Sequence, residues 1–212
     1  TVFSFHPVKI ITTGEGGASL TNNKMYYEKM LQFRENGIIF DKKRLIKKSE
    51  YAGYYEQVST GYNYRMNELS AALGISQLKK LKKFLNKRKQ IAKKYIDELK
   101  NFPIQFQKIE KYNLSSYHIM IVKFNINKLK LNYKQIFNKF RKNRIFVNLH
   151  YSALHLNPYF RSLGFKKKQF LNSEDYSKSS LSVPNYYDLK KSDFNKVIKI
   201  IKSIIWKKIK LF

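Results

Sequence analysis

Phe3-Ser4-Phe5-His6-Pro7-Val8-Lys9 is the stretch of sequence that decides the fold of this chain, and Gly14-Glu15-Gly16-Gly17-Ala18 follows it closely. The apolar residues from 1 to 5 are typical of the end of a buried strand, and Pro7 cannot continue a central strand because it lacks an N–H donor. Lys9 therefore lies just past a strand end. In a partly desolvated pocket, such a lysine can lose its proton and attack a carbonyl carbon to form a Schiff base.

Two further features of the sequence accompany this lysine. The glycines at 14, 16 and 17 permit a tight chain reversal with positive φ, and residues 18–21 resume an extended run. A second block at 61–72 reads Gly-Tyr-Asn-Tyr-Arg-Met-Asn-Glu-Leu-Ser-Ala-Ala, and Gln-Leu-Lys-Lys-Leu follows it at 77–81. Its apolar residues recur at a helical period, with small residues that allow close backbone approach.

Both blocks resemble the hallmarks of the DegT/DnrJ/EryC1/StrS family of pyridoxal-phosphate sugar aminotransferases. In the lysine motif of that family a serine precedes the lysine by five residues and Gly-Glu-Gly-Gly follows it; here these are Ser4, Lys9 and residues 14–17. The resemblance covers nearly the whole chain. It is greatest to members that act in pseudaminic acid biosynthesis and aminate a UDP-linked 4-keto-6-deoxy sugar.

The fold class implied by this resemblance is α/β, and the chain would be the C-terminal part of a fold-type-I pyridoxal-phosphate-dependent transferase. Residues 1–85 would form the C-terminal end of the large cofactor-binding domain, with the Schiff-base lysine and an interface helix. Residues 86–212 would form the small C-terminal α/β domain. The chain also begins without methionine inside an apolar strand, so we expect it to be part of a longer protein.

The resemblance implies pyridoxal 5'-phosphate as cofactor, with Lys9 as both its covalent anchor and the base that moves a proton. Ser4 matches the family's phosphate contact, and a hydroxyl suits a phosphate oxygen; the alternative is a plain surface hydroxyl. His6 either satisfies a buried hydrogen bond or lies beside the Schiff base of the cofactor or the substrate. Asn63 matches the residue that reaches across a homodimer to the partner's cofactor phosphate, or it is a turn asparagine.

The implied reaction is transfer of an amino group from glutamate to C4 of a UDP-linked 4-keto-6-deoxy-N-acetylhexosamine, in nucleotide-sugar and surface-glycan biosynthesis. Asn148, Leu149, His150 and Tyr151 resemble the family segment that contacts the nucleotide sugar, and the alternative is a wet loop with a partly buried tyrosine. Arg65 either supports the cofactor phosphate or sugar diphosphate, or pairs with Glu68 along a helix.

The charge of the chain offers a competing interpretation. There are 43 Lys and Arg against 14 Asp and Glu, a net charge of +29, which normally suggests nucleic acid or an anionic membrane. The lysines are spread along the chain, however, and residues with AT-rich codons abound. Solvated surface charge is therefore favoured, with neither nucleic acid nor membrane as partner, and a basic binding protein is kept as an alternative.

Other classes of protein are argued against by what the sequence lacks. It contains no cysteine, and its four histidines have no metal-ligand spacing, so we expect no metal site. It has neither a long apolar stretch nor a secretory signal, which makes the cytoplasm the default location. Two alternatives within the family are an inactive truncated fragment and a dehydratase-like relative, in which histidine replaces the lysine; Lys9 argues against the second.

The remaining pattern predicts alternating helices and strands. A helix capped by Asn22 or Asn23 should end near Glu35, before Gly37, and an irregular loop should follow over 38–59. The other expected elements are a helix over 66–81 that continues to about residue 101, strands over 117–124, 145–150 and 181–184, a helix over 133–143, and a last helix over 193–208 that Ser192 caps. The apolar stripe of that last helix should pack on the sheet of the small domain, rather than on a membrane surface.

Overall fold

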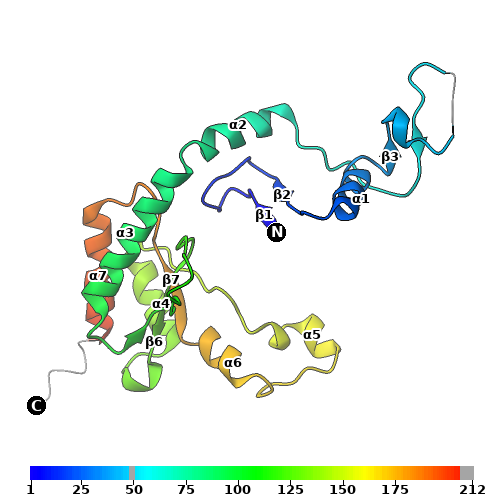
Figure 1. Cartoon of the computed structure of the whole chain (residues 1–212). Coiled ribbons are helices and arrows are strands. Elements are labelled where there is room, and N and C mark those ends of the chain that lie inside the picture. Colours follow the sequence, from blue (N-terminus) through cyan, green and yellow to red (C-terminus); the bar gives the residue numbers. More distant parts are fainter. Residues whose placement is uncertain (48–50, 206–212) are drawn as a thin grey trace, which may run out of the picture. The chain divides into compact units, whose positions relative to one another are not determined.

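Figure 1 shows the chain as a computed structural model, which describes residues 1–47 and 51–205. The described residues form two compact units, which divide between residues 81 and 82. The domain boundary predicted from the sequence, between residues 85 and 86, falls within helix α3 (Leu81–Leu99). Each unit is described separately.

The first unit begins with an antiparallel ribbon of two short strands, β1 (Val2–Ser4) and β2 (Gly17–Ser19). The prediction of a strand before Lys9 is confirmed, but its burial is not, because Val2 is 80% and Phe3 46% exposed. A ribbon of two strands leaves its faces uncovered. The ribbon nevertheless defines where the chain turns, so it positions residues 5–16 at one of its ends.

Helix α1 (Lys24–Arg34) follows, and its ends are as the sequence predicts. The Asn23 Oδ1 atom accepts a hydrogen bond from the Tyr26 N–H at 3.1 Å and so caps the helix. Gly37 comes just after it with φ +75°, and a Cβ atom at that position would clash with the Ser59 carbonyl. Only glycine suits this left-handed position, which brings residues 59–64 against the end of α1.

The predicted loop over 38–59 contains more order than its irregular pattern indicates. Strands β3 (Ile38–Ile39) and β4 (Glu56–Gln57) pair antiparallel, and a 3₁₀ turn η1 spans Lys42–Arg44. The buried Glu56 carboxylate accepts hydrogen bonds from the backbone N–H groups of Ile46 and Lys47 at 2.5 and 2.7 Å. Desolvation alone would raise the pKa of Glu56, but these bonds outweigh it and lower the pKa.

Helix α2 (Glu68–Leu78) is capped by the Asn67 side chain, which accepts from the Ser70 N–H. The prediction of one continuous helix from residue 66 to about 101 is wrong, because a turn at Lys79 and Lys80 separates α2 from α3. The Lys79 N–H still bonds to the Ile75 carbonyl, but the Lys80 N–H bonds to the Gln77 carbonyl three residues back, so the chain tightens to a turn there. The apolar spacing of the sequence does not indicate this change.

The second unit is a three-stranded antiparallel sheet with helices packed against it (Figure 1). The strand order is β5-β6-β7, and Val122 of β6 lies opposite Leu181 of β7. One hydrophobic core holds side chains from this sheet and from three helices, α3, α4 and α7. The elements are β5 (Ile104–Gln105), β6 (Met120–Phe124), η2 (Ile126–Lys128), α4 (Tyr133–Lys142), η3 (Leu154–Leu156), α5 (Pro158–Ser162), α6 (Leu171–Ser177), β7 (Ser180–Val183) and α7 (Lys191–Ile205).

Three predicted elements of this unit differ from the structure by two residues or more. The strand expected over 117–124 begins only at Met120, and Tyr117 before it adopts φ +46°. The strand expected over 145–150 is a single bridge between Asn148 and Ser182, because Arg144 adopts φ +57° and the Ile145 N–H bonds back to Phe140, at the end of α4. Helix α7 begins at Lys191, two residues earlier than predicted, so Ser192 lies inside it. Residues 206–208, where the prediction ended that helix, lie outside the described residues.

The apolar stripe of α7 is buried in the core, as the pattern of the sequence predicts: Val197, Ile200, Ile201, Ile204 and Ile205 are each at most 9% exposed. Two contacts attach this helix to α3. The Tyr95 and Phe194 rings lie 4.6 Å apart, and the Lys202 Nζ lies 2.8 Å from the Glu98 carboxylate. Within residues 1–47 and 51–205, no helix has the length and apolar character needed to cross a membrane.

The core of the second unit predicts a contrast between two leucines. Leu181 in β7 is fully buried, whereas Leu114 is 90% exposed. Leu181→Ala should lower the free energy of unfolding by about 2–5 kcal/mol, because it removes buried methyl groups and leaves a cavity. Leu114→Ala should change it by less than about 0.5 kcal/mol. Urea unfolding followed by circular dichroism measures both, and equal losses would contradict this assignment of the core.

Candidate active site

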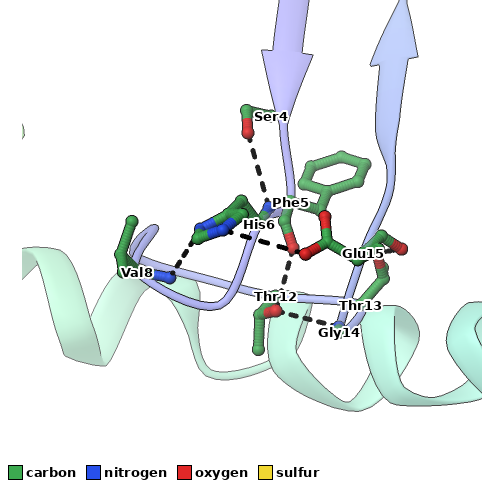
Figure 2. Close-up of polar contacts among 8 residues, drawn as sticks. All are labelled: Ser4, Phe5, His6, Val8, Thr12, Thr13, Gly14 and Glu15. Carbon is green, nitrogen blue, oxygen red and sulfur yellow. Dashed lines mark hydrogen bonds and ion pairs between the residues drawn. The ribbon is translucent and has the colours of Figure 1, made fainter.

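The turn that carries Lys9 is closed by hydrogen bonds around Phe5, and Figure 2 shows the one from the Thr12 side chain. The Phe5 N–H donates to the Gly16 carbonyl at 2.9 Å, and the Phe5 carbonyl accepts from the Thr13 N–H at 3.0 Å and the Thr12 hydroxyl at 2.8 Å. The Lys9 N–H donates to the His6 carbonyl at 2.9 Å. Lys9 is thus held on a short closed loop next to the ribbon, half-buried.

Ser4 and His6 lie on the same turn, and their hydrogen bonds define what each can still do. The Ser4 Oγ accepts from the His6 N–H at 3.4 Å, so the hydroxyl hydrogen remains able to donate. The His6 Nδ1 accepts from the Val8 N–H at 3.2 Å, so in the neutral ring Nε2 carries the hydrogen. That Nε2 lies 3.8 Å from the Glu15 carboxylate.

The glycines after Lys9 are required by the close approach of backbone and side chains. A Cβ atom at Gly17 would lie 2.7 Å from the Phe3 carbonyl oxygen of the paired strand. Gly16 has φ +150°, and a Cβ atom there would lie 2.5 Å from the Thr13 Oγ1. The Thr13 hydroxyl itself donates to the Glu15 carbonyl at 2.7 Å. This reversal returns the chain to β2 and so closes the loop of Lys9.

Asn63 and Arg65 lie at a second place in the first unit, the C-terminal end of α1. Asn63 forms an antiparallel bridge with Glu35, and the Arg65 guanidinium lies 3.0 Å from the Glu35 carboxylate. The alternative pairing of Arg65 with Glu68 is therefore wrong. Burial would raise the pKa of Glu35, but hydrogen bonds from Arg65 and Arg34 outweigh it and lower the pKa.

The two groups of candidate residues in this unit are not joined directly. Among the described residues, no hydrogen bond or ion pair connects Asn63 or Arg65 to the loop of Lys9. Arg65 does line a cavity of about 850 Å³ together with Phe3 and Gly17 of the ribbon and aromatic residues of α1. The structure therefore gathers Ser4, His6 and Lys9, and places Arg65 at a neighbouring cavity.

The predicted substrate-binding segment belongs to the second unit and runs beside β7. The Ser182 N–H donates to the Asn148 carbonyl at 2.9 Å, and the Ser182 hydroxyl lies 2.9 Å from the His150 Nδ1. Leu149 is half-buried, while Tyr151 is exposed with its ring edge-on to His150 at 4.9 Å. The four residues thus form one surface stretch held at the edge of the sheet. Nothing in the sequence indicated that Ser182 holds it.

A buried pair of hydrogen-bonded side chains follows this stretch, and sequence reasoning missed its acidic member. The His155 Nε2 lies 3.0 Å from the Glu174 carboxylate, and both side chains are 6–7% exposed. The His155 ring also packs edge-on against Phe170 at 4.9 Å. The hydrogen bond from His155 is the main cause that lowers the pKa of Glu174, and the Lys168 N–H and the more distant Lys178 add to it. The pair joins η3 to α6.

Comparisons with solved structures define the class of fold. The chain superposes on Helicobacter pylori PseC, described as an aminotransferase involved in the biosynthesis of pseudoaminic acid, with a TM-score of 0.82 and 29% identity, over 97% of this chain and 53% of that one. It shares its fold with the protein Spr1654 of Streptococcus pneumoniae in its PLP form, at 23% identity and a TM-score of 0.82, over 98% and 52% of the two chains. The fold is the C-terminal part of an aminotransferase of the fold-type-I class.

Sequence comparison identifies the family. Residues 1–202 match the DegT/DnrJ/EryC1/StrS aminotransferase family, and the chain belongs to it, as the two motif blocks predict. A UDP-4-amino-4,6-dideoxy-N-acetyl-beta-L-altrosamine transaminase of Campylobacter jejuni is 34% identical over 211 residues, which are 97% of this chain and 52% of that protein. The chain spans about half the length of the curated relatives it matches.

The buried pair predicts a pH dependence of stability. Because the folded-state pKa of Glu174 is lowered, its stabilising contribution is present above the unfolded-state pKa and is lost as the pH falls through the folded-state value. Glu174→Gln should lower the urea midpoint at pH 7, and the difference from wild type should shrink on acidification to about pH 3. Glu110→Gln, on an exposed pair with Lys108, should change the midpoint little at either pH. A constant difference for Glu174→Gln would show that its carboxylate charge is not involved.

Proposed function

We propose that this protein is a pyridoxal-phosphate-dependent aminotransferase in which Lys9 binds the cofactor covalently. The observation that supports this most is the closed loop after β1, which holds the amine of Lys9, the hydroxyl of Ser4 and the imidazole of His6 on one turn of a chain from this family. A ligand with an aldehyde and a phosphate group requires a primary amine to react with its carbonyl carbon, and hydrogen-bond donors for its phosphate oxygens. This turn provides both.

The residues on the loop fit this cofactor chemically. Because the Ser4 oxygen accepts its bond from the backbone, the hydroxyl hydrogen is available to a phosphate oxygen. Lys9 is half-buried and lies on a loop that is fixed at both ends, which lowers the conformational entropy lost on binding. When bound, pyridoxal phosphate supplies an aldehyde carbon that takes up an amino group and later delivers it.

Lys9 would perform two tasks in such an enzyme. Its Nζ atom would form the covalent link to the cofactor and, once released, would move a proton between the substrate carbon and the cofactor. His6, whose Nε2–H faces the Glu15 carboxylate, would keep the turn in shape beside that amine. Asn63 would contribute to the cofactor phosphate of a partner subunit, which makes the proposed enzyme a homodimer with shared active sites.

The proposed substrate is a UDP-linked 4-keto-6-deoxy-N-acetylhexosamine, with glutamate as amino donor, acted on in the cytoplasm. The names of similar proteins support this: an altrosamine transaminase of Campylobacter jejuni and an aminotransferase of pseudoaminic acid biosynthesis. Asn148, Leu149, His150 and Tyr151 would contact the nucleotide sugar, and Arg65 would meet a phosphate or diphosphate. The net charge of +29 favours the approach of such anionic ligands.

Lys9→Ala is the direct test of the covalent site. Borohydride reduction of the wild-type protein incubated with pyridoxal phosphate should fix the cofactor on the peptide that contains Lys9, as mass spectrometry of the digest shows. Lys9→Ala should lose this adduct and the transaminase activity, because no other amine occupies the loop. Lys24→Ala, which removes an exposed lysine at the start of α1, should retain the adduct. An adduct on another lysine in the wild type would contradict the assignment, and a protein that binds no cofactor would favour an inactive fragment.

Ser4→Ala tests the phosphate contact separately from the covalent link. Removing one hydrogen bond to a charged phosphate should weaken the binding of pyridoxal phosphate by about 1.5–3 kcal/mol, or roughly 10- to 150-fold. Ser19→Ala, on the exposed partner strand of the same ribbon, should leave the affinity unchanged. Fluorescence titration of the cofactor measures both dissociation constants. Equal affinities for the two variants would assign Ser4 to the surface.

A further inference from the structure

Arg141, at the end of α4, is held between two aromatic rings. Its guanidinium carbon lies 5.1 Å from the centre of the Phe137 ring, one helical turn earlier, and 5.1 Å from that of Phe146, just after the helix. A planar guanidinium stacks well on such rings, and this restricts its rotation as well as its position. The Nε atom is buried and has no hydrogen-bond partner among the described residues. The position of the guanidinium is therefore set by the two aromatic rings and by the hydrogen bonds of its Nη2 atom.

The Nη2 end of the guanidinium points at the predicted substrate-binding segment. The Arg141 Nη2 donates to the Val147 carbonyl at 3.0 Å and to the Asn148 side-chain oxygen at 3.4 Å. Ser182 holds the backbone of Asn148 from the other side through two main-chain bonds, of 2.9 and 3.4 Å, and one from its hydroxyl at 3.2 Å. The backbone of Asn148 is thus fixed by β7 and its side chain by α4.

The contact with Arg141 determines which way the Asn148 amide is turned. A guanidinium has only donors, so the atom of the amide that faces it must be the oxygen. The amide NH₂ group then points away from Arg141, and Asn148 is exposed, so that group can reach a ligand as a hydrogen-bond donor. Without Arg141 either orientation of the amide would be allowed.

We propose that Arg141 is a positioning residue that turns the Asn148 amide NH₂ group toward an acceptor oxygen of the bound nucleotide sugar. This inference rests on the proposed function, in which residues 148–151 contact that substrate. Uracil carbonyl and diphosphate oxygens are both acceptors, so the recognised chemistry is an oxygen acceptor on the nucleotide. Arg141 itself makes no contact with the ligand and acts through Asn148.

A double-mutant cycle in the protein tests this coupling. Dissociation constants for UDP-N-acetylglucosamine, UDP and uridine are measured by isothermal titration calorimetry for wild type, Arg141→Lys, Asn148→Ala and the double variant. Lysine keeps the positive charge of Arg141, so the fold suffers less than with alanine. It has neither the planar fork of the guanidinium nor its stacking on the rings, which are the features under test. Lys142→Ala, which removes an exposed neighbouring charge, is the control, and thermal unfolding shows that each variant is folded.

We expect each single variant to weaken the binding of UDP-N-acetylglucosamine by roughly 3- to 10-fold, as for one lost hydrogen bond. The double variant should be no weaker than Asn148→Ala alone, because residues that act through one contact are not additive. Lys142→Ala should bind as wild type does. A loss that extends to uridine would assign the acceptor to the uracil, and a loss confined to the two diphosphates would assign it to the diphosphate; both outcomes support the inference.

Three results would overturn the inference. Normal binding by Arg141→Lys, with Asn148→Ala weakened, would show that Asn148 acts without Arg141 and would leave the proposed function intact. Additive losses in the double variant would show that Arg141 acts by another route. Normal binding by Asn148→Ala would remove the proposed donor. Tyr151→Ala then tests whether residues 148–151 belong to the proposed substrate site at all. If this variant also binds UDP-N-acetylglucosamine as wild type does, they do not.

Discussion

The antiparallel pairing of β7 with β6 is the interaction on which the second unit depends. It buries every residue of β7 and places Leu181 opposite Val122 within the core that α3, α4 and α7 complete. Beyond Leu181, the same strand presents Ser182 to Asn148 and His150. A fully buried strand has no room to shift in a close-packed core. Strand β7 therefore holds Asn148 and His150 in fixed positions at the surface.

The first unit is organised by a different principle. In its described part, residues 1–47 and 51–81, the buried residues are polar or glycine: Thr13, Gly37 and Glu56. Its order comes from directional bonds, such as those around Phe5 and those that Glu56 accepts, and from glycines that allow backbones to touch. Hydrogen bonds define angles as well as distances. The loop of Lys9 is accordingly defined in geometry although large apolar side chains nearby remain exposed.

The sequence predicts the local features of this structure and misses the long-range ones. The Asn23 cap, the turn at Gly37 and the loop of Lys9 depend on residues close together in the chain, so their patterns can be recognised. By contrast, Arg65 pairs with Glu35 over 30 positions, and Ser182 meets His150 over 32. No periodicity indicates such pairs. The strand predicted over 145–150 failed for a different reason: apolar alternation does not reveal the turn at Arg144, where the Ile145 N–H bonds back to Phe140 at the end of α4.

In this molecule, the overall charge that attracts anions and the polar groups that can distinguish one anion from another are different features. A net charge of +29 attracts any anion, and its effect is screened within roughly 8 Å at physiological salt, so it cannot select one nucleotide from another. Selection requires a few polar groups with fixed orientations, since a misoriented donor leaves a buried acceptor unpaired. Arg141 and Ser182 give Asn148 and His150 such orientations, from a helix and a strand that belong to the same core. If residues 148–151 bind the substrate as proposed, the lysines other than Lys9 can vary in position with little effect on recognition, whereas Arg141 and Ser182 cannot.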